Sequence, residues 1–565
     1  MYLISLCFPA QKRSETVRRD TAMRMEERLS TNSKWIATVA SIWIQCSVGT
    51  TYTFSIYSST LKSTQNYDQS TLERVAVFKD MGGSAGILSG LLFSYVTLNH
   101  HHHQTRTRFL RGPWVVHFTG AILCFTGYFL VWASVVGLLP RPVPVPLMCL
   151  FIFTAAHAQN FFNTGNIVTG VMNFGHYSGT IVGILKGFVG LSGAVLTQVY
   201  KTVCNGNPST FILVLALLPT LVSLLFMSHV RIYGTNSVDD KKHLNAFSAV
   251  AMTLAAYFMV ITVMENLLTF PLWARIITFI ILLLLLASPL RVAITADRED
   301  AMTSPKLSTP QQDPLAYHEL ADDESKVTAA FDDKILKDEE DMNLLQAMCT
   351  GNFWFLCIAT LCGMGSGIAT MNNIAQVGES LHYSTTEINS LISLWSIWNF
   401  FGRFGAGYGS DVFLHKLGWA RPIFMVITLV AMSIGHIAIA SGFPGNLFVG
   451  TMIVGVCYGS QWSLMPTITS EIFGVRHMGT IFNTISIACP VGSYICSVRI
   501  IGRIYDRVAS GEDHTCYGTH CFMLSFMIMA FVAFFGSLVA FLLFLRTRRF
   551  YNQVVIRRLQ HSSTT

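Results

Sequence analysis

Lys186 is the charged residue whose position points most directly to chemistry. It interrupts the apolar stretch from Gly179 to Tyr200, roughly 10 Å from one end at 1.5 Å per residue. A charge at that depth in a membrane helix is costly and marks a functional site by default. Facing a cavity, its ammonium would hold an anionic substrate. The alternative is a lysine whose long stem carries the charge to the membrane surface.

Other polar residues interrupt apolar stretches in the same way. His157, Asn160 and Thr164 follow each other at helical spacing and therefore share one face. Such a stripe suits a water-filled cavity, and it suits hydrogen bonds between helices equally well. We predict a binding site for a small solute from Lys186, His157, Asn160, Asn163, Asn372 and Asn483.

Acidic residues are missing from the middle of every predicted span. Proton coupling through a carboxylate at the membrane midplane is therefore not expected. If protons are coupled, His157 is the better candidate because histidine titrates near neutral pH. Anion exchange and facilitated diffusion are equally open.

The segment from Asn399 to Pro422 has the residues of a gate. Gly407 would allow two helices to approach closely. Asp411, at a helix end, can pair with a cation or with the N-terminus of another helix. Arg403 and Arg421 are the candidate cations. We predict that these residues latch one conformation shut on the cytoplasmic side; the alternative is a simple turn with arginines at the membrane surface.

Two groups of His and Cys residues raise the question of a metal. His514, Cys516, His520 and Cys521 could bind zinc or copper, but a Cys516–Cys521 disulfide is favoured on the non-cytoplasmic side. The run His100–His103 is interpreted as a solvated basic loop, since adjacent side chains seldom converge on one ion. We expect no metal, no cofactor and no enzyme activity.

The elements that must position these residues are membrane helices. The chain has 565 residues, 52% of them hydrophobic and 12% charged, with a mean hydropathy of +0.48. About fourteen apolar stretches approach the ~20 residues that a spanning helix needs. The net charge of +7 comes from basic clusters between apolar runs, so no nucleic-acid partner is expected. Lys and Arg in the loops place both termini in the cytoplasm.

Composition divides the chain into six parts. The segment 294–350 is rich in Asp, Glu, Ser and Pro, and we interpret it as a disordered cytoplasmic linker with a possible partner. The predicted parts are an N-terminal arm (1–34), a first bundle of six helices (35–230), an extra helix pair (244–293), the linker (294–350), a second bundle (351–545) and a cytoplasmic tail (546–565).

The two bundles have a phrase in common. Phe174-Gly175 is followed by Gly179-Thr180-Ile181 in the first block, and Phe473-Gly474 by Gly479-Thr480-Ile481 in the second. Paired half-repeats are typical of secondary transporters, whose site lies near the midplane between the halves. The alternative is coincidence in glycine-rich membrane sequence.

The residues also resemble a known family. The segments 34–57, 113–116 and 179–200 resemble the plant nodulin-like domain, and 344–383 and 390–411 resemble the second half of the same proteins. The chain is therefore similar to nuclear-fusion-defective-type nodulin-like proteins of the major facilitator superfamily. That resemblance implies two six-helix bundles that rock about a central cavity. The family is also similar to oxalate/formate antiporters and monocarboxylate porters, which makes Lys186 and the second-half arginines candidates for binding a carboxylate.

The expected function is secondary transport of a small organic anion across the bilayer. The alternative is a membrane receptor or organelle-fusion factor that uses the same fold and docks a partner on the linker. The sequence leaves open whether the protein lies in the plasma membrane or in an endomembrane such as the vacuolar one.

Overall fold

The computed structural model describes residues 33–98, 112–233, 240–268, 270–303, 341–508 and 516–555. Within these ranges the regular elements are all helical, and twelve helices are long and apolar enough to cross a membrane. Because a helix satisfies its own backbone hydrogen bonds, it can cross hydrocarbon where irregular backbone cannot. The chain is a multi-pass helical membrane protein.

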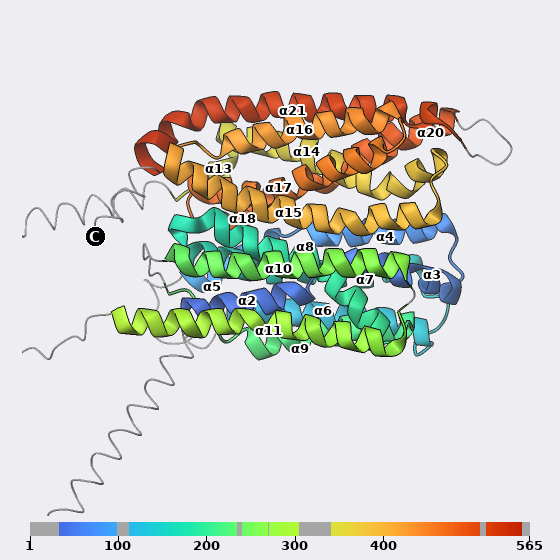
Figure 1. Ribbon diagram of the computed structural model, residues 1–565, viewed down its shortest axis with the longest axis horizontal. Coiled ribbons are helices and arrows are strands. Elements are labelled where there is room, and N and C mark those ends of the chain that lie inside the picture. The colour runs from blue at the N-terminus through green and yellow to red at the C-terminus, as the bar shows by residue number, and fades with distance from the viewer. Residues whose placement is uncertain are drawn as a thin grey trace, which may run out of the picture.

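The helices run side by side in two groups (Figure 1). The first half begins with a helix that breaks near Gly49, so that α2 and α3 together form one segment, and α4 and α5 likewise follow each other. Its elements are α2 (Lys34–Ser47), η1 (Thr50–Thr53), α3 (Phe54–Gln65), α4 (Gln69–Ser84), α5 (Ile87–Leu98), α6 (Trp114–Val136), α7 (Val145–Asn173), η3 (Gly175–Tyr177), α8 (Ser178–Thr202) and α9 (Pro208–Phe226).

The second half repeats this order of helices. Its fifth segment begins as α-helix, in α18 and α19, and continues as a π-helix, η4. The elements are α13 (Leu344–Met348), α14 (Gly351–Ser380), α15 (Thr385–Leu417), α16 (Pro422–Ser441), α17 (Asn446–Phe473), α18 (Met478–Ser486), α19 (Ala488–Tyr494), η4 (Ile495–Gly502), α20 (Arg503–Val508) and α21 (Met523–Phe550).

Local signals set several helix boundaries. At α2, the Ser33 hydroxyl accepts a hydrogen bond from the backbone N–H of Ile36, which satisfies one of the donors that a helix start leaves unpaired. At α15, Ser384 and Glu387 cap each other's backbone in a capping box. Gly418 ends the same helix with a left-handed φ of 66°, a conformation that glycine adopts without a steric cost.

Two of the expected spans are not among the twelve helices. The first is divided by the break near Gly49 into α2 and α3, each too short to cross alone. The second is α15, which is 33 residues long but contains Asn, Gly, Arg and Asp residues that lower its hydropathy. The expectation of about fourteen spans stays a prediction.

The second span begins earlier than the sequence analysis expected. The apolar helix runs over Thr71–Thr97, not from residue 78, so Asp80 lies further from its end than expected. The Asp80 carboxylate pairs with the neighbouring Lys79 at 3.1 Å. Asp80 still lies between the start and the middle of this helix, so the expectation that acidic residues are missing from the middle of every span stays a prediction.

The extra helix pair lies along one side of the bundles (Figure 1). Its helices are α10 (Asp240–Leu267) and α11 (Leu272–Thr303). α11 continues ten residues past the expected boundary at 293, so residues 294–303 are helix where the linker was predicted to start. Residues 304–340 lie outside the described ranges, as do the N-terminal arm before residue 33 and the tail after 555.

Buried apolar side chains show how the halves meet. One large cluster contains residues of α2, α8 and α10 together with residues of α15, α17 and α21. Two further clusters are separate, one formed within the first half and one within the second. The halves therefore have a common core at one end of the molecule and separate cores at the other.

Candidate functional site

Lys186 lies where the two halves meet. It is on α8 with 3% of its surface exposed, and its Nζ lies 5.0 Å from the ring centroid of Trp462 and 5.7 Å from that of Phe482. Both aromatic residues belong to the second half, on α17 and α18. A buried ammonium near an aromatic face gains a cation–π interaction, which offsets only part of the cost of removing it from water.

Arg403 is the second buried cation at this place. It lies on α15 and is 1% exposed. Its guanidinium donates to Asn399 Oδ1 at 2.9 Å, to the backbone oxygen of Lys186 at 3.1 Å and to the Tyr52 hydroxyl at 3.1 Å. Its Cζ lies 5.6 Å from the Trp462 ring centroid. Arg403 thus joins α15 to α8 and to η1 in the first half.

Neither cation has a carboxylate partner in the described part of the chain. The ion pairs there include no acidic group within 4.0 Å of Lys186 or Arg403. The indole N–H of Trp462 is also buried without a hydrogen-bond partner. Buried charges are normally paired, so two uncompensated cations beside a free donor form a site that is complementary to an anion. We call Lys186, Arg403, Tyr52 and Trp462 the central site.

The other predicted substrate residues make different contacts. His157 and Asn160 both face the backbone oxygen of Gly82, at 3.3 and 2.8 Å, which ties α7 to α4. Asn163 accepts a hydrogen bond from Gln45 at 3.2 Å. Asn372 is exposed on α14. These contacts join helices and do not lead to Lys186, so a substrate-binding role for these residues stays a prediction.

Asp411 lies at a second contact between the halves. Its carboxylate, 2% exposed, accepts hydrogen bonds from the backbone N–H groups of Gly179 and Thr180 and from the Thr180 hydroxyl at 2.6 Å. These donors are the start of α8. The N-terminus of a helix attracts an anion because its unpaired N–H groups and its dipole both point there.

Arg421 completes this contact. Its guanidinium, 1% exposed, pairs with Asp411, with Glu471 at 2.5 Å and with the Ser410 hydroxyl at 2.6 Å. Arg403 was predicted to be an alternative cation for Asp411 and is not placed there: it lies eight residues earlier on α15, about 12 Å along the helix. We call Asp411, Arg421, Thr180 and Gly407 the latch.

Gly407 has the role in close packing that its type suggests. A Cβ atom at this position would lie 2.7 Å from the Cα of Gly183 and closer still to the backbone oxygen of Gly179. Real Cβ atoms essentially never approach that closely. The α8 and α15 backbones touch here because both positions are glycine, the small residue enriched where membrane helices cross.

A matching contact joins the other pair of repeat helices, α5 and α18. A Cβ at Gly90 would lie 2.5 Å from the Cα of Thr480, as Gly407 lies against Gly179. Ser94, four residues after Gly90, approaches the Thr480 hydroxyl at 3.5 Å. Asn483 donates to the Thr164 hydroxyl of the first half at 2.7 Å. We call this the neutral seam. The repeated Gly-Thr-Ile phrase points to this contact in the sequence, but nothing in the sequence marks Ser94 as part of it.

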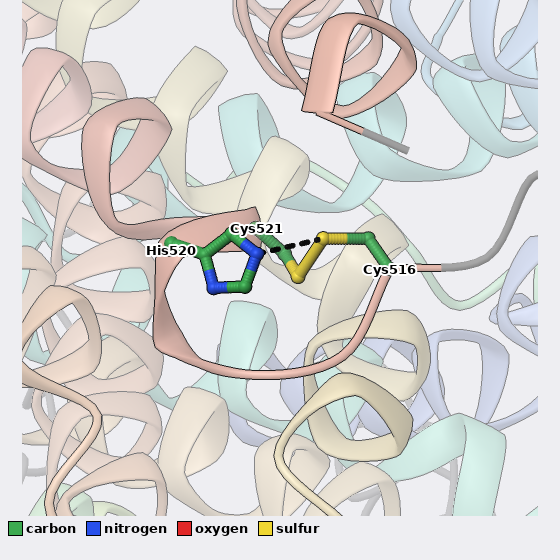
Figure 2. Close-up of side chains that lie close together, drawn as sticks. All are labelled: Cys516, His520 and Cys521. Atoms are coloured by element: carbon green, nitrogen blue, oxygen red, sulfur yellow. Dashed lines mark hydrogen bonds between the residues drawn. A yellow bond between two sulfur atoms is a disulfide. The ribbon is translucent and has the colours of Figure 1, made fainter. Parts of the chain in front are cut away.

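The Cys516–Cys521 pair is a disulfide in the structure (Figure 2). His520 lies beside it, with Nε2 3.8 Å from the Cys516 sulfur. The segment is held to the rest of the second half by a hydrogen bond from the Gly518 N–H to the Ser380 oxygen at 2.8 Å. Both sulfurs are used in the bond. His514 and His100–His103 lie outside the described residues.

Sequence reasoning missed two members of the central site, Tyr52 and Trp462, and the contact that Asn399 makes with Arg403. Tyr52 lies in the break of the first segment, Trp462 is one of ten tryptophans, and Asn399 was noticed only as part of the gate. Each is recognised only once α8, α15 and α17 are placed together. Asn399 had a signal, since its spacing of four from Arg403 puts both on one helix face.

The fold belongs to a known class of membrane proteins. The chain superposes on the structure of a proton:xylose symporter of the major facilitator superfamily, XylE, with a TM-score of 0.54 over 92% of this chain and 95% of that one, at 12% identity. A second XylE structure, of a double Trp mutant, gives a TM-score of 0.53 at 14% identity. The fold is that of the major facilitator superfamily.

Sequence comparisons narrow this class. A Nodulin-like domain profile matches residues 34–294, and the profile of the NFD4 C-terminal domain matches 338–553. The chain belongs to the nodulin-like, NFD4-type proteins of this superfamily. It is 25% identical to Protein NUCLEAR FUSION DEFECTIVE 4 of Arabidopsis thaliana over 92% of this chain and 90% of that protein.

Shorter matches lead to proteins described as transporters. The probable transporter MCH1 of Yarrowia lipolytica is 28% identical over 28% of this chain and 34% of its own length. The uncharacterized transporter YhjX of Escherichia coli is 26% identical over 28% of this chain and 38% of its own length. The chain is thus a transporter-type membrane protein, similar in part to proteins with transporter names.

Proposed function

We propose that this protein is a secondary transporter that moves a small organic anion by alternating access. The observation that carries the proposal is the pair of buried cations, Lys186 and Arg403, which have no acidic partner in the described residues. They come from opposite halves and converge on the Trp462 ring. An anion bound between them would supply the missing charge.

A carboxylate suits the donors at this site. The guanidinium of Arg403 presents a planar fork that matches two carboxylate oxygens, and the Lys186 ammonium adds a point charge. The Trp462 indole N–H and the Tyr52 hydroxyl are further polar groups within the same site. Binding an anion here would replace the hydrogen bond from Arg403 to Tyr52 and so couple the site to the broken first segment.

The packing of the halves supports an access cycle. The halves have a common core at the latch end and separate cores at the other end, as expected for a transporter closed at the latch end. Positive loop charges predict that the latch end is cytoplasmic. We therefore propose that this conformation is closed to the cytoplasm and that the latch stabilises it.

Uptake into proteoliposomes tests the proposal. Labelled mono- and dicarboxylates, a sugar and an organic cation would be compared for the wild type, Lys186→Ala and Arg403→Ala. Loss of one charge-assisted hydrogen bond should reduce kcat/KM for the anion by roughly 10- to 150-fold. Lys201→Ala is the control, because Lys201 lies on the same helix but pairs with Glu265 at 2.6 Å.

Other outcomes contradict the proposal in distinct ways. Transport of the sugar or the cation that is unchanged in both variants would keep the transporter and reject the anion site. Absence of flux for every solute, from protein with a cooperative unfolding transition, would favour the alternative function of a docking protein. The linker on which that alternative depends lies mostly outside the described residues.

A further inference from the structure

A hollow opens at the latch end where three parts of the chain meet. Its walls come from the start of α8 in the first half, the start of α10 in the extra pair and the end of α15 in the second half. Lys241 and Asn245 line it from α10, and His415 and Lys416 from α15. Val412 and the Tyr177 ring, both partly exposed, give it an apolar wall. The hollow therefore combines cations, an amide and an apolar surface.

The positive charge of this hollow is not balanced. Neighbouring acidic groups already have partners: Asp240 pairs with Lys34 at 2.6 Å, Glu299 with Lys242 at 2.5 Å, and Asp411 with Arg421. In the part of the chain that the structure describes, no ion pair involves Lys241 or Lys416. Within the described ranges, two exposed ammonium groups thus flank the hollow without an ion-pair partner.

We propose that this hollow binds a phosphate group carried by an anionic lipid. Lysine is a common phosphate ligand, acting as a point charge. Basic clusters at the cytoplasmic ends of membrane helices attract anionic headgroups, and the partly exposed Val412 and Tyr177 suit the apolar part of a lipid better than they suit a free ion. Asp411 also faces the hollow, but its oxygens already accept hydrogen bonds from Arg421, which it shares with Glu471, and from the start of α8.

Such a ligand would strengthen the closed state. α10 is joined to the first half through the Lys34–Asp240 and Lys201–Glu265 pairs, whereas Lys416 belongs to the second half. A phosphate held by Lys241 and Lys416 therefore bridges the halves beside the latch. This consequence rests on the latch geometry, whereas the binding itself does not depend on transport activity.

Thermal unfolding of the full chain in lipid nanodiscs tests the site. Nanodiscs of phosphatidylcholine alone would be compared with nanodiscs that also contain phosphatidylinositol phosphate. The anionic lipid should raise the unfolding midpoint of the wild type by about 3 °C or more. The double variant Lys241→Ala/Lys416→Ala should lose most of that rise.

Matched controls decide between outcomes. Lys242→Ala removes the adjacent lysine, which pairs with Glu299, and should keep the full rise. Lys241→Gln and Lys416→Gln singly should each lose part of it, which keeps the test valid if the double variant does not fold. An equal rise in the double variant, or no rise in the wild type, would overturn the proposal. A rise with inorganic phosphate in neutral nanodiscs would keep the phosphate chemistry and overturn the lipid as its source.

Discussion

The latch and the neutral seam join equivalent helices of the two halves with different chemistry. At both, a glycine of one half lies against the Gly-Thr of the other, Gly407 against Gly179 and Gly90 against Gly479. Four residues later the latch has Asp411 where the neutral seam has Ser94. Among the residues that the structure describes, only the latch adds a buried arginine, Arg421. Close packing is therefore common to both contacts, and charge belongs to one.

This difference separates two requirements of a closing contact. The glycines set how closely the helices approach, and this requirement does not depend on the residue four positions later. The charged groups set how much opening costs, because separating the halves would expose or strand a buried ion pair. Single substitutions can change one requirement at a time.

The largest expected effect is that of Asp411→Asn. Asparagine keeps the size of aspartate but leaves Arg421 buried with less compensation, and breaking a buried pair costs about 3–5 kcal/mol. The variant should unfold at a lower temperature. A cysteine introduced at Ser178, buried at the start of α8, should react faster with a polar thiol reagent, measured above the background from Cys349. Unchanged reactivity would reject a gating role for the latch.

Gly407→Ala tests the steric requirement alone. Its added methyl group would enter the α8 backbone, and overpacking of this kind costs about 1–3 kcal/mol. Gly409→Ala is the matched control on the same helix, because its Cβ would meet nothing within 4 Å. Gly90→Ala should resemble Gly407→Ala, since both contacts need the same approach. Thermal unfolding of the three variants gives the comparison, and equal stability of Gly407→Ala and Gly409→Ala would contradict it.

The variant Ser94→Asp tests whether a carboxylate without an arginine partner can stabilise the contact between the halves. The new carboxylate would lie beside the start of α18 with the Thr480 hydroxyl as donor, but with no counterpart of Arg421 in the described residues. Helix-dipole stabilisation of up to about 2 kcal/mol does not cover the burial of an unpaired charge. We expect a lower unfolding midpoint. A higher midpoint would mean that the helix N-terminus suffices.

The smallest effect concerns Asp341, which holds the loop before α18 by accepting a hydrogen bond from the Arg476 N–H at 3.3 Å. Burial raises the pKa of this carboxyl group, with Arg476 and His477 opposing the shift. A raised pKa in the folded state gives stability at low pH that is lost as pH rises through that pKa. Asp341→Asn should therefore unfold at the same or a slightly higher temperature at pH 7, and its midpoint should change less between pH 4 and pH 7. A lower midpoint at pH 7 would contradict this.

Much of the architecture could be predicted from the sequence, because apolar length and loop charge report directly on membrane spans. The latch was predictable in part: the partner of Asp411 was expected to be a cation or a helix N-terminus, and it has both. The expected place of Asp411 at a helix end was wrong, because α15 continues to Leu417. The central site was only half predictable. Lys186 is conspicuous as a charge in an apolar run, whereas Trp462 and Tyr52 are unremarkable until α17 and η1 are placed beside α8.

Arg403 shows that closeness in the sequence does not predict which side chains are in contact. It stands in the same short segment as Asp411, but a helix of that length carries it from the membrane surface to the depth of Lys186. The second span shows a related limit. Its first turns are polar and include Glu73 and Asp80. They lower the local hydropathy, so the sequence does not show where the helix begins.

The extra helix pair makes the two moving parts unequal. Beyond the pairs with Lys34 and Lys201, Tyr257 on α10 bonds Gln198 on α8 and the Thr278 oxygen of α11. The hydrogen bonds and ion pairs described here thus fix α10 and α11 to the first half. Under the proposed access cycle, the first half would move together with α10 and α11 against the second half. α10 would then slide along α15. In that cycle, each turnover would therefore include this movement as well as the opening of the latch.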